Sequence, residues 1–338
     1  MRTPASHALW IAVGLTAAAA CAQEPAPPPS QEPAQQAAQE ATQQPAPGAV
    51  ELNQRGLQSM YAGDLDSAQK DFDQAMTLRP DWPTPLANRG YAGCLAHDFA
   101  AGKADVDEAL RRLGQAAPAA DRSSVRYARA SCLVLLGRTK EAIVDFSAAI
   151  EADPDSSDAL VARGLARGNE KDYEGAKADL GRAHALKPDS AAIEMMRGHV
   201  SDVMGELDDA VGAYEHAIAL ATPSASALND LCAARSLLGK SLDKALAECD
   251  ESLRLQPDFP EALDSRATVN LRLGRLKEAV DDATAALERK PDLASSYFVR
   301  AAALRRLGVA EAAQRDLAHA RQIDPGVEES FARYGVAP

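Results

Sequence analysis

The sequence has few aromatic residues and no cluster of basic residues. Aromatic side chains make up 4% of the 338 residues, which argues against two conventional globular domains and favours closely packed, alanine-rich helices. The net charge of −13 at pH 7 and the lack of Lys/Arg runs remove the attraction on which non-specific nucleic-acid binding depends. Nucleic acid is therefore not an expected partner.

Sequence patterns of catalytic sites are also missing. The chain contains no HExxH, GxSxG, Walker or dinucleotide-binding fingerprint. The histidines beyond the N-terminal segment are scattered over different predicted helices, and no nucleophile and base are paired in sequence. They are His97, His184, His199, His216 and His319. We therefore expect no enzyme, no cofactor and no metal site.

Residues 1–21 are predicted to be an export signal. Arg2 precedes an apolar stretch over residues 8–20, which is the length of a signal hydrophobic region and too short to span a bilayer. The sequence around Cys21, AAACA, permits two cuts. Ordinary signal peptidase would recognise A-C-A, whereas A-A-A-C resembles a bacterial lipobox that would lipidate Cys21. We expect a periplasmic protein, or an outer-membrane lipoprotein in the second case.

Residues 22–48 are predicted to be a disordered linker rich in proline, glutamine and alanine. Apart from Thr42, the segment has no aromatic or β-branched residue, and its prolines interrupt any helix. One interpretation is a tether that extends up to roughly 80 Å, at about 3.1 Å per residue. The alternative is an inert remnant of the export signal.

From residue 49 onward the sequence repeats with a period of 34 residues. Small residues recur at positions 8, 15, 20 and 27, an aromatic or leucine at position 24 and proline at position 32. In the clearest unit these are Gly56, Gly63, Ala68, Ala75, Phe72 and Pro80. Small residues let two helices approach closely, glycine suits the turn, and proline ends the second helix.

This pattern resembles the tetratricopeptide repeat (TPR) family, which implies an all-α solenoid of helical hairpins. The expected units are 49–82, 83–116, 123–156, 157–190, 191–224, 225–259, 260–293 and 294–327, followed by a cap over 328–338. The second unit carries Gly102 in place of the usual alanine and a longer link, so we expect looser stacking there. The sixth has one extra residue, which we place in the turn after Gly239.

Charged residues recur in register. Arginine occupies position 7 in seven units: Arg55, Arg89, Arg129, Arg163, Arg197, Arg266 and Arg300. An acid occupies position 23 in most: Asp71, Asp105, Asp145, Asp179, Glu248, Asp282 and Asp316. Because the pairs recur in nearly every unit, we interpret them as a ladder that fixes the stacking register of the helices. The alternative is a row of charges that binds a ligand.

Two cysteine pairs are disulfide candidates. Cys232 and Cys249 lie on the two predicted helices of the sixth unit, and export to an oxidising compartment permits a bridge. The pair also resembles cysteine pairs of secreted bacterial repeat proteins. We hypothesise a Cys232–Cys249 disulfide, with two small buried thiols as the alternative. Cys94 and Cys132, on adjacent units, form a weaker second pair.

The TPR resemblance implies that positions 2, 5, 9 and 12 of each first helix line an inner groove. Predicted partner contacts are Asn53, Tyr91, Tyr127, Met195, His199, Asn229, Phe298 and Arg305. Amides, aromatics and a basic C-terminal end suit an extended peptide or a partner helix. The alternative for several of them, Phe298 above all, is packing between hairpins.

We therefore predict a protein–protein interaction scaffold or adaptor of the bacterial cell envelope. Its organisation is similar to that of repeat lipoproteins that pilot secretins or support outer-membrane assembly, which implies a protein or peptide partner. Membrane attachment would come only through Cys21. The main alternative is a self-associating structural protein, and a remote alternative is an enzyme with an unrecognised site.

Overall fold

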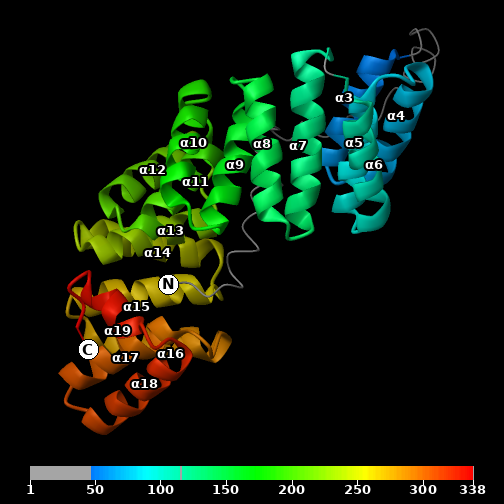
Figure 1. Cartoon of the computed structure of the whole chain (residues 1–338). Helices are drawn as coiled ribbons and strands as arrows, with labels where there is room; N and C mark the ends of the chain where they lie inside the picture. The colour runs from blue at the N-terminus through cyan, green and yellow to red at the C-terminus, as the bar shows by residue number, and fades with distance from the viewer. Residues whose placement is uncertain (1–46, 115, 338) are drawn as a thin grey trace, which may run out of the picture. The chain divides into compact units, whose positions relative to one another are not determined.

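The computed structural model describes residues 47–114 and 116–337, and all regular structure in these ranges is helical (Figure 1). The predicted export signal, Cys21 and all but the last two linker residues lie outside the described residues. The helices are α3 Ala49–Tyr61, α4 Leu65–Leu78, α5 Pro83–Leu95, α6 Phe99–Arg112, α7 Ala119–Leu135, α8 Thr139–Ala152, α9 Ser157–Asn169, α10 Tyr173–Leu186, α11 Ala191–Met204, α12 Leu207–Leu220, α13 Ala225–Leu238, α14 Leu242–Leu255, α15 Pro260–Arg272, α16 Leu276–Arg289, α17 Ala294–Arg306, α18 Ala310–Ile323 and α19 Val327–Ala332.

The helices form two compact units. The first unit contains α3–α10 and ends at Lys187, and the second begins at Pro188 and contains α11–α19. In each unit, consecutive helices pair into four hairpins, here numbered one to eight along the chain, and the second unit adds α19. The predicted fold class, about eight TPR hairpins with a short C-terminal capping helix, is confirmed.

Each hairpin turns through a residue with positive φ. Glycine fills this place in six hairpins, for example Gly63 with a φ of 83° and Gly205 with a φ of 80°. In hairpins two and four, His97 (φ 64°) and Lys171 (φ 65°) adopt the same left-handed conformation, which costs more for residues with a Cβ. In the sixth hairpin, Lys240 and Ser241 (φ 52°) separate Gly239 from α14, whereas in the first hairpin a single residue separates Gly63 from α4. The extra residue therefore lies in the turn, as predicted.

The inside of a typical hairpin pairs a small residue with a large one. A Cβ placed on Gly56 would lie 2.6 Å from the ring of Phe72, and one on Gly198 would lie 2.5 Å from the ring of Tyr214. Both rings are buried. The glycines therefore let an aromatic ring of the second helix rest directly on the backbone of the first.

The expectation of looser stacking in the second hairpin is wrong. Gly90 of α5 and Gly102 of α6 face one another, and a Cβ on Gly102 would lie 2.6 Å from the Gly90 carbonyl oxygen and 2.7 Å from the Cys94 nitrogen. Two opposed glycines allow the backbones to approach more closely than alanine would. The missing alanine thus tightens the hairpin.

The arginine–acid pairs form a ladder that joins helices, as the structural interpretation predicts. Arg163 donates to both carboxylate oxygens of Asp179 in its own hairpin, at 2.8 and 2.6 Å, and to Ser147 Oγ of the preceding hairpin at 3.1 Å. Such an arginine therefore fixes the two helices of its hairpin and, beyond the first hairpin, ties them to the hairpin before. Equivalent in-hairpin pairs are Arg55–Asp71, Arg89–Asp105, Arg129–Asp145, Arg266–Asp282 and Arg300–Asp316.

The fifth hairpin lacks this arrangement. The position equivalent to the ladder acid is Ala213, whose side chain cannot accept from Arg197. Arg197 instead pairs at 2.9 Å with buried Glu194 of its own helix, which also lies 3.3 Å from His216 Nδ1. This break in the ladder falls in the first hairpin of the second unit.

In the sixth hairpin the ladder arginine is displaced by one helical turn. Position 7 is Leu231, and Arg235 takes its place, donating to Glu248 of the same hairpin at 3.0 Å and to Glu215 of the preceding hairpin at 2.7 Å. A shift of four residues keeps the side chain on the same helix face. Glutamate partners, one methylene longer than aspartate, reach it there.

Two disulfides are present. Cys232 and Cys249, the predicted pair, are bonded with their Cα atoms 5.5 Å apart, inside the sixth hairpin. They occupy the place that the small residue and the ring fill in other hairpins, so a covalent bond replaces that packing contact. Cys94 and Cys132 are bonded with a Cα separation of 5.6 Å and tie the second hairpin to the third.

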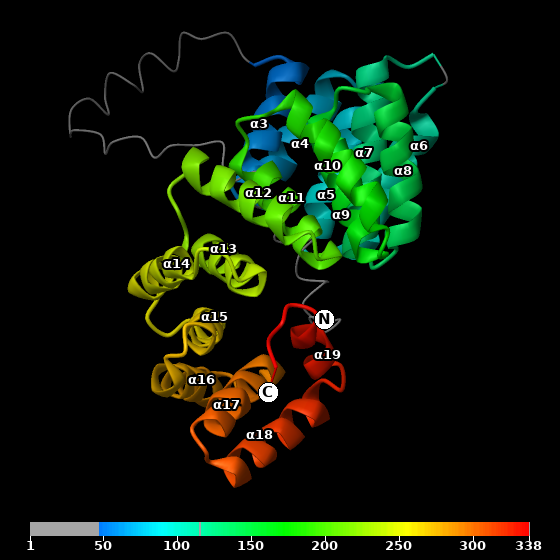
Figure 2. The ribbon, with the colours of Figure 1, turned by 90° about the vertical axis from the view of Figure 1, so that its left-hand side faces the viewer.

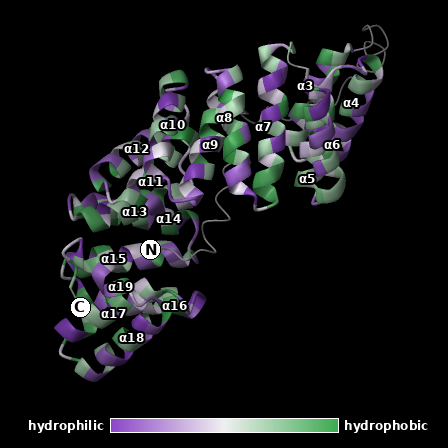
Figure 3. Ribbon diagram, in the orientation of Figure 1, coloured by the Kyte–Doolittle hydropathy of each residue, from purple (hydrophilic) through white to green (hydrophobic). Residues whose placement is uncertain are grey.

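Most helices carry apolar residues on one side and polar residues on the other (Figure 3). This pattern is typical of helices that bury one face against neighbours. Within the described residues, no helix is long and apolar enough to cross a membrane.

Candidate partner-binding face

The predicted groove depends on which side chains of the first helices remain exposed in each unit. Two predicted contacts, Asn53 and Asn229, are not exposed. Asn88 of the next hairpin donates to Asn53 Oδ1 at 2.9 Å, and Ser265 of the next hairpin donates to Asn229 Oδ1 at 2.8 Å. Both asparagines are buried. They join neighbouring hairpins, which corrects their prediction as partner contacts.

Tyr91 and Phe298 are also wrong as exposed contacts. Tyr91 is 4% exposed and packs in the core of hairpins one to three. Phe298 is 0% exposed and stacks on Phe331 of α19, with ring centroids 4.5 Å apart. Phe298 therefore serves packing inside the protein, which was the alternative interpretation of this residue.

The remaining predicted contacts of the second unit serve mixed roles. His199 Nε2 lies 3.3 Å from Asp230 of the next hairpin, and its ring contacts Tyr214 edge-on at 5.2 Å. Met195 is partly buried and packs beside the same tyrosine. Arg305 is exposed near the end of α17. These residues do not gather into one site.

The predicted basic C-terminal end has a structural role. Arg272 Nη2 donates to the Leu237 carbonyl at 2.9 Å, and Arg306 Nη1 donates to the Leu271 carbonyl at 3.2 Å. Each arginine thus reaches the last turn of the preceding first helix, where the helix dipole favours a cation. Neither residue faces a partner through these contacts.

In the first unit, by contrast, several tyrosines influence one another electrostatically. Tyr61, at the end of α3, is 46% exposed, yet desolvation by surrounding protein, followed by repulsion from the Asp158 carboxylate, raises its pKa. Asp158 lies in the first turn of α9, so a side chain of the fourth hairpin acts on a tyrosine of the first. Tyr61 was not among the predicted groove positions 2, 5, 9 and 12 of the first helices, because it is the last residue of α3.

Tyr127 is the predicted contact that belongs to this group of tyrosines. It is partly buried, and desolvation raises its pKa, with further contributions from Tyr91, Tyr61 and Asp158. Buried Ser131 lies beside Tyr91 and Tyr127, and its hydroxyl lowers both tyrosine pKa values against the larger, opposing effect of desolvation. We call Tyr61, Tyr127, Ser131 and Asp158 the tyrosine face.

The rim of the tyrosine face carries one ion pair. Lys187 Nζ donates to Asp158 Oδ1 at 3.0 Å, and both side chains are mostly exposed. An exposed pair of this kind contributes little to stability, about 0–1 kcal/mol. It can exchange partners with a charged ligand at small cost.

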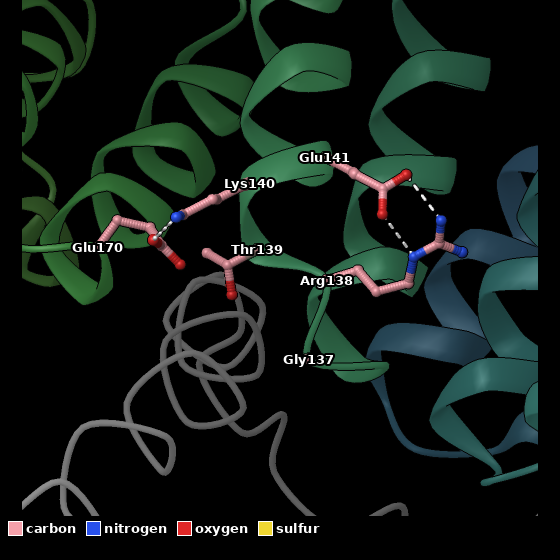
Figure 4. Close-up of a pocket in the computed structure, with 6 residues that line it drawn as sticks. All are labelled: Gly137, Arg138, Thr139, Lys140, Glu141 and Glu170. Atoms are coloured by element: carbon pink, nitrogen blue, oxygen red, sulfur yellow. Dashed lines mark hydrogen bonds and ion pairs between the residues drawn. The ribbon is translucent and has the colours of Figure 1, made fainter.

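A shallow pocket lies elsewhere, at the turn of the third hairpin (Figure 4). Arg138 donates to both carboxylate oxygens of Glu141 at 2.6 and 2.7 Å, which raises the arginine pKa, and Lys140 Nζ lies 3.9 Å from Glu170. These charges are exposed and neutralise one another. In the described ranges no three His, Cys, Asp or Glu side chains are grouped to hold a metal ion. We assign no catalytic site.

The hairpins, the ladder and the small-residue interiors define a helical-repeat protein. Residues 96–157 and 234–294 match the family model described as tetratricopeptide repeat. Tetratricopeptide repeat protein 13 of Homo sapiens is 31% identical over 177 residues, which cover 50% of this chain and 20% of that protein. Tetratricopeptide repeat protein 37 of Xenopus laevis is 25% identical over 60% of this chain and 13% of that protein. The chain therefore spans one fifth or less of each curated relative.

Solved structures agree on the fold. PilW, described as a widely conserved type IV pilus biogenesis factor, has a TM-score of 0.52 and 22% identity, covering 63% of this chain and 98% of its own. PilF of Pseudomonas aeruginosa has a TM-score of 0.50 and 18% identity, covering 64% and 99%. The chain shares the fold of these repeat proteins, and two of its stretches match the tetratricopeptide repeat model. Such repeats generally mediate protein–protein interaction and are typically non-catalytic scaffolds.

Proposed function

We propose that this protein is an exported adaptor of the bacterial envelope that holds a peptide segment or helix of a partner protein on the tyrosine face of its first unit. The observation that carries the proposal is the 46% exposed side chain of Tyr61, which acts electrostatically on the largely desolvated Tyr127. Tyrosine offers a rigid apolar surface with a polar tip, which suits both the side chains and the main chain of a bound peptide. The exposed Asp158–Lys187 pair supplies a polar rim.

Export is supported by the cysteines as well as by the N-terminal sequence. Structural disulfides persist in oxidising compartments, and the two bridges engage all four cysteines beyond Cys21. Cys21 is then either lipidated or removed at an ordinary signal cleavage. Fractionation of the Cys21→Ala variant separates these: release from membranes supports a lipid anchor, and unchanged fractionation removes it.

Site-specific photo-crosslinking in cells tests the adaptor role. A photoreactive phenylalanine analogue at Tyr61 or Tyr127 should capture the same envelope protein, identified by mass spectrometry. The control position is Val144, which is 66% exposed on the second helix of its hairpin and should give none of that adduct. Adducts only with a second copy of this chain would replace the adaptor by self-association. Adducts shared with Val144 would remove the tyrosine face as the site.

A further inference from the structure

The chain beyond the last hairpin reaches further than a cap requires. Helix α19 covers the eighth hairpin, where Phe331 stacks on Phe298. The segment then turns through Gly335, whose φ is 69°, and the Val336 nitrogen donates to the Phe331 carbonyl at 3.1 Å. This is the bonding pattern of a glycine-ended helix, and it returns buried Val336 to the core cluster. We call residues 331–336 the C-terminal segment.

The next contact lies outside the last hairpin. Arg272, at the end of α15 in the seventh hairpin, donates through Nη2 to the main-chain carbonyl of Tyr334 as well as to Leu237. Burial lowers the pKa of Arg272, and no carboxylate lies within ion-pair distance of it among the described residues. Its Nε is buried without an acceptor in the same ranges. Arg272 therefore donates to main-chain carbonyl oxygens, and its Nε–H donor has no acceptor among the described residues.

The Tyr334 side chain extends further still, to the fifth hairpin. Its hydroxyl lies 3.4 Å from the position that a Cβ on Gly205 would take, at the end of α11. Burial raises the pKa of Tyr334, and the Asp202 carboxylate raises it further. The C-terminal segment thus contacts α17 through Phe331 and α15 through Tyr334, and it reaches the end of α11, all within one unit. In Figure 2, α19 lies beside α17 and α18.

We propose that the C-terminal segment is a built-in ligand of the second unit's inner side, and that this side binds a partner segment of the same chemistry. The bound form has an aromatic residue, a tyrosine three residues on, an apolar residue two further on, and a main-chain carbonyl for Arg272. A partner segment must displace the one already there. This site is separate from the tyrosine face, so the inference does not depend on the proposed function.

Displacement follows from competition. A segment tethered a few residues from its site has an effective concentration in the millimolar range. A free segment of the same sequence therefore binds weakly while the tethered one is seated, and its apparent dissociation constant falls as the seated fraction falls. Weakening the tethered copy should strengthen binding of the free one.

The test uses the full chain and a fluorescent peptide with the sequence of residues 326–337, GVEESFARYGVA. Phe331→Ala in the protein should tighten peptide binding at least about tenfold relative to the wild-type protein. Tyr334→Ala, which leaves the Phe331–Phe298 stack intact, should tighten it less, and it serves if Phe331→Ala fails to fold. Adding Arg272→Ala to either variant should abolish the gain.

The outcomes are distinct. Equal affinity for the wild-type and variant proteins means that the tethered segment does not occupy the site, and no binding to any of them means that it is only a cap. A scrambled peptide that binds as well as the native one also overturns the proposal. Photo-crosslinking at Tyr61 is a separate readout, so this inference and the adaptor function fail independently.

Discussion

The two units are built from the same hairpins but differ in how continuous their polar framework is. In the first unit every hairpin pairs its position-7 arginine with an aspartate of its second helix. In the second unit the ladder is broken in hairpin five and displaced in hairpin six, and it resumes only with Arg266 and Arg300. A repeat can therefore lose its register device locally when another contact takes over.

The inner sides of the units differ in the same way. The first unit keeps one tyrosine, Tyr61, 46% exposed, whereas the second unit places its own Tyr334 and Phe331 against its first helices. The first unit thus leaves an aromatic side chain accessible, and the second packs its C-terminal aromatic side chains against its own helices. This contrast teaches that a shared repeat does not imply a shared binding surface.

The largest expected effect removes the most buried ladder acid of the first unit. Asp179 is 2% exposed and accepts from Arg163 and Arg167. Asp179→Ala leaves both guanidinium groups without their acceptor and should cost about 3–5 kcal/mol of unfolding free energy. Urea unfolding followed by circular dichroism measures it.

The matched control for Asp179→Ala is Asp71→Ala. Its partner Arg55 is 53% exposed, so water replaces the lost acceptor, and the cost should stay near about 1 kcal/mol. Equal losses at the two positions would mean that the ladder contributes nothing specific to register.

The second effect compares the two disulfides. Their sequence separations are 38 residues for Cys94–Cys132 and 17 for Cys232–Cys249. Loop-closure entropy predicts losses of about 4 and about 3 kcal/mol on replacing each pair with alanines. Local hydrogen exchange should place the first loss in hairpins two and three and the second in hairpin six. A larger loss for the shorter loop would indicate that packing of the buried sulfurs outweighs chain entropy.

Whether a structural feature could be predicted from the sequence depends on how local the interactions are that produce it. The hairpins were predictable because Gly56, Gly63 and their equivalents act within 34 residues, so one period repeats the whole local requirement. The ladder was predictable for the same reason. Its displacement to Arg235 was not, since a one-turn shift leaves the same helix face but breaks the positional register.

The candidate site was predicted less well. Asn53 and Asn229 occupy groove positions, but an amide bonds equally to a partner or to the next hairpin, and here Asn88 and Ser265 satisfy them. Tyr61 was not predicted because the last groove position, 12, precedes it in the first helix. The sequence signal that could have identified it is an aromatic residue directly before the turn of the hairpin. The reach of Tyr334 depends on contacts across more than a hundred residues, which no local pattern encodes.

The third effect probes the tight second hairpin. Gly102→Ala places a methyl group 2.6 Å from the Gly90 carbonyl and should cost about 1–3 kcal/mol. Gly181→Ala is the control: it lies exposed in α10 with nothing within 4 Å of the new Cβ, so better helix propensity should stabilise by up to about 1 kcal/mol. Thermal unfolding of both variants gives the two signs. Stabilisation by both would mean that α5 and α6 can separate freely.

The smallest effect is a difference in the sign of pH dependence between the units. In the first unit, a hydrogen bond from Arg112 lowers the pKa of Glu108, so the stabilising contribution of this carboxylate is present above the unfolded pKa and is lost as pH falls through the folded pKa. In the second unit, burial raises the pKa of Glu248 despite Arg235. That contribution is complete below the ordinary value of 4.5 and is lost as pH rises through the folded pKa.

Glu248→Gln tests that sign. The glutamine amide cannot ionise, so the variant should not lose stability at this site as pH rises from about 4.5 towards neutrality. The difference between the wild-type and variant unfolding free energies should therefore change by less than about 1 kcal/mol over that range. Urea unfolding at successive pH values measures it, and carboxyl NMR titration gives the Glu248 pKa directly. A pKa below 4.5 would mean that the Arg235 pair outweighs desolvation, and the displaced ladder of the sixth hairpin would then equal the regular one.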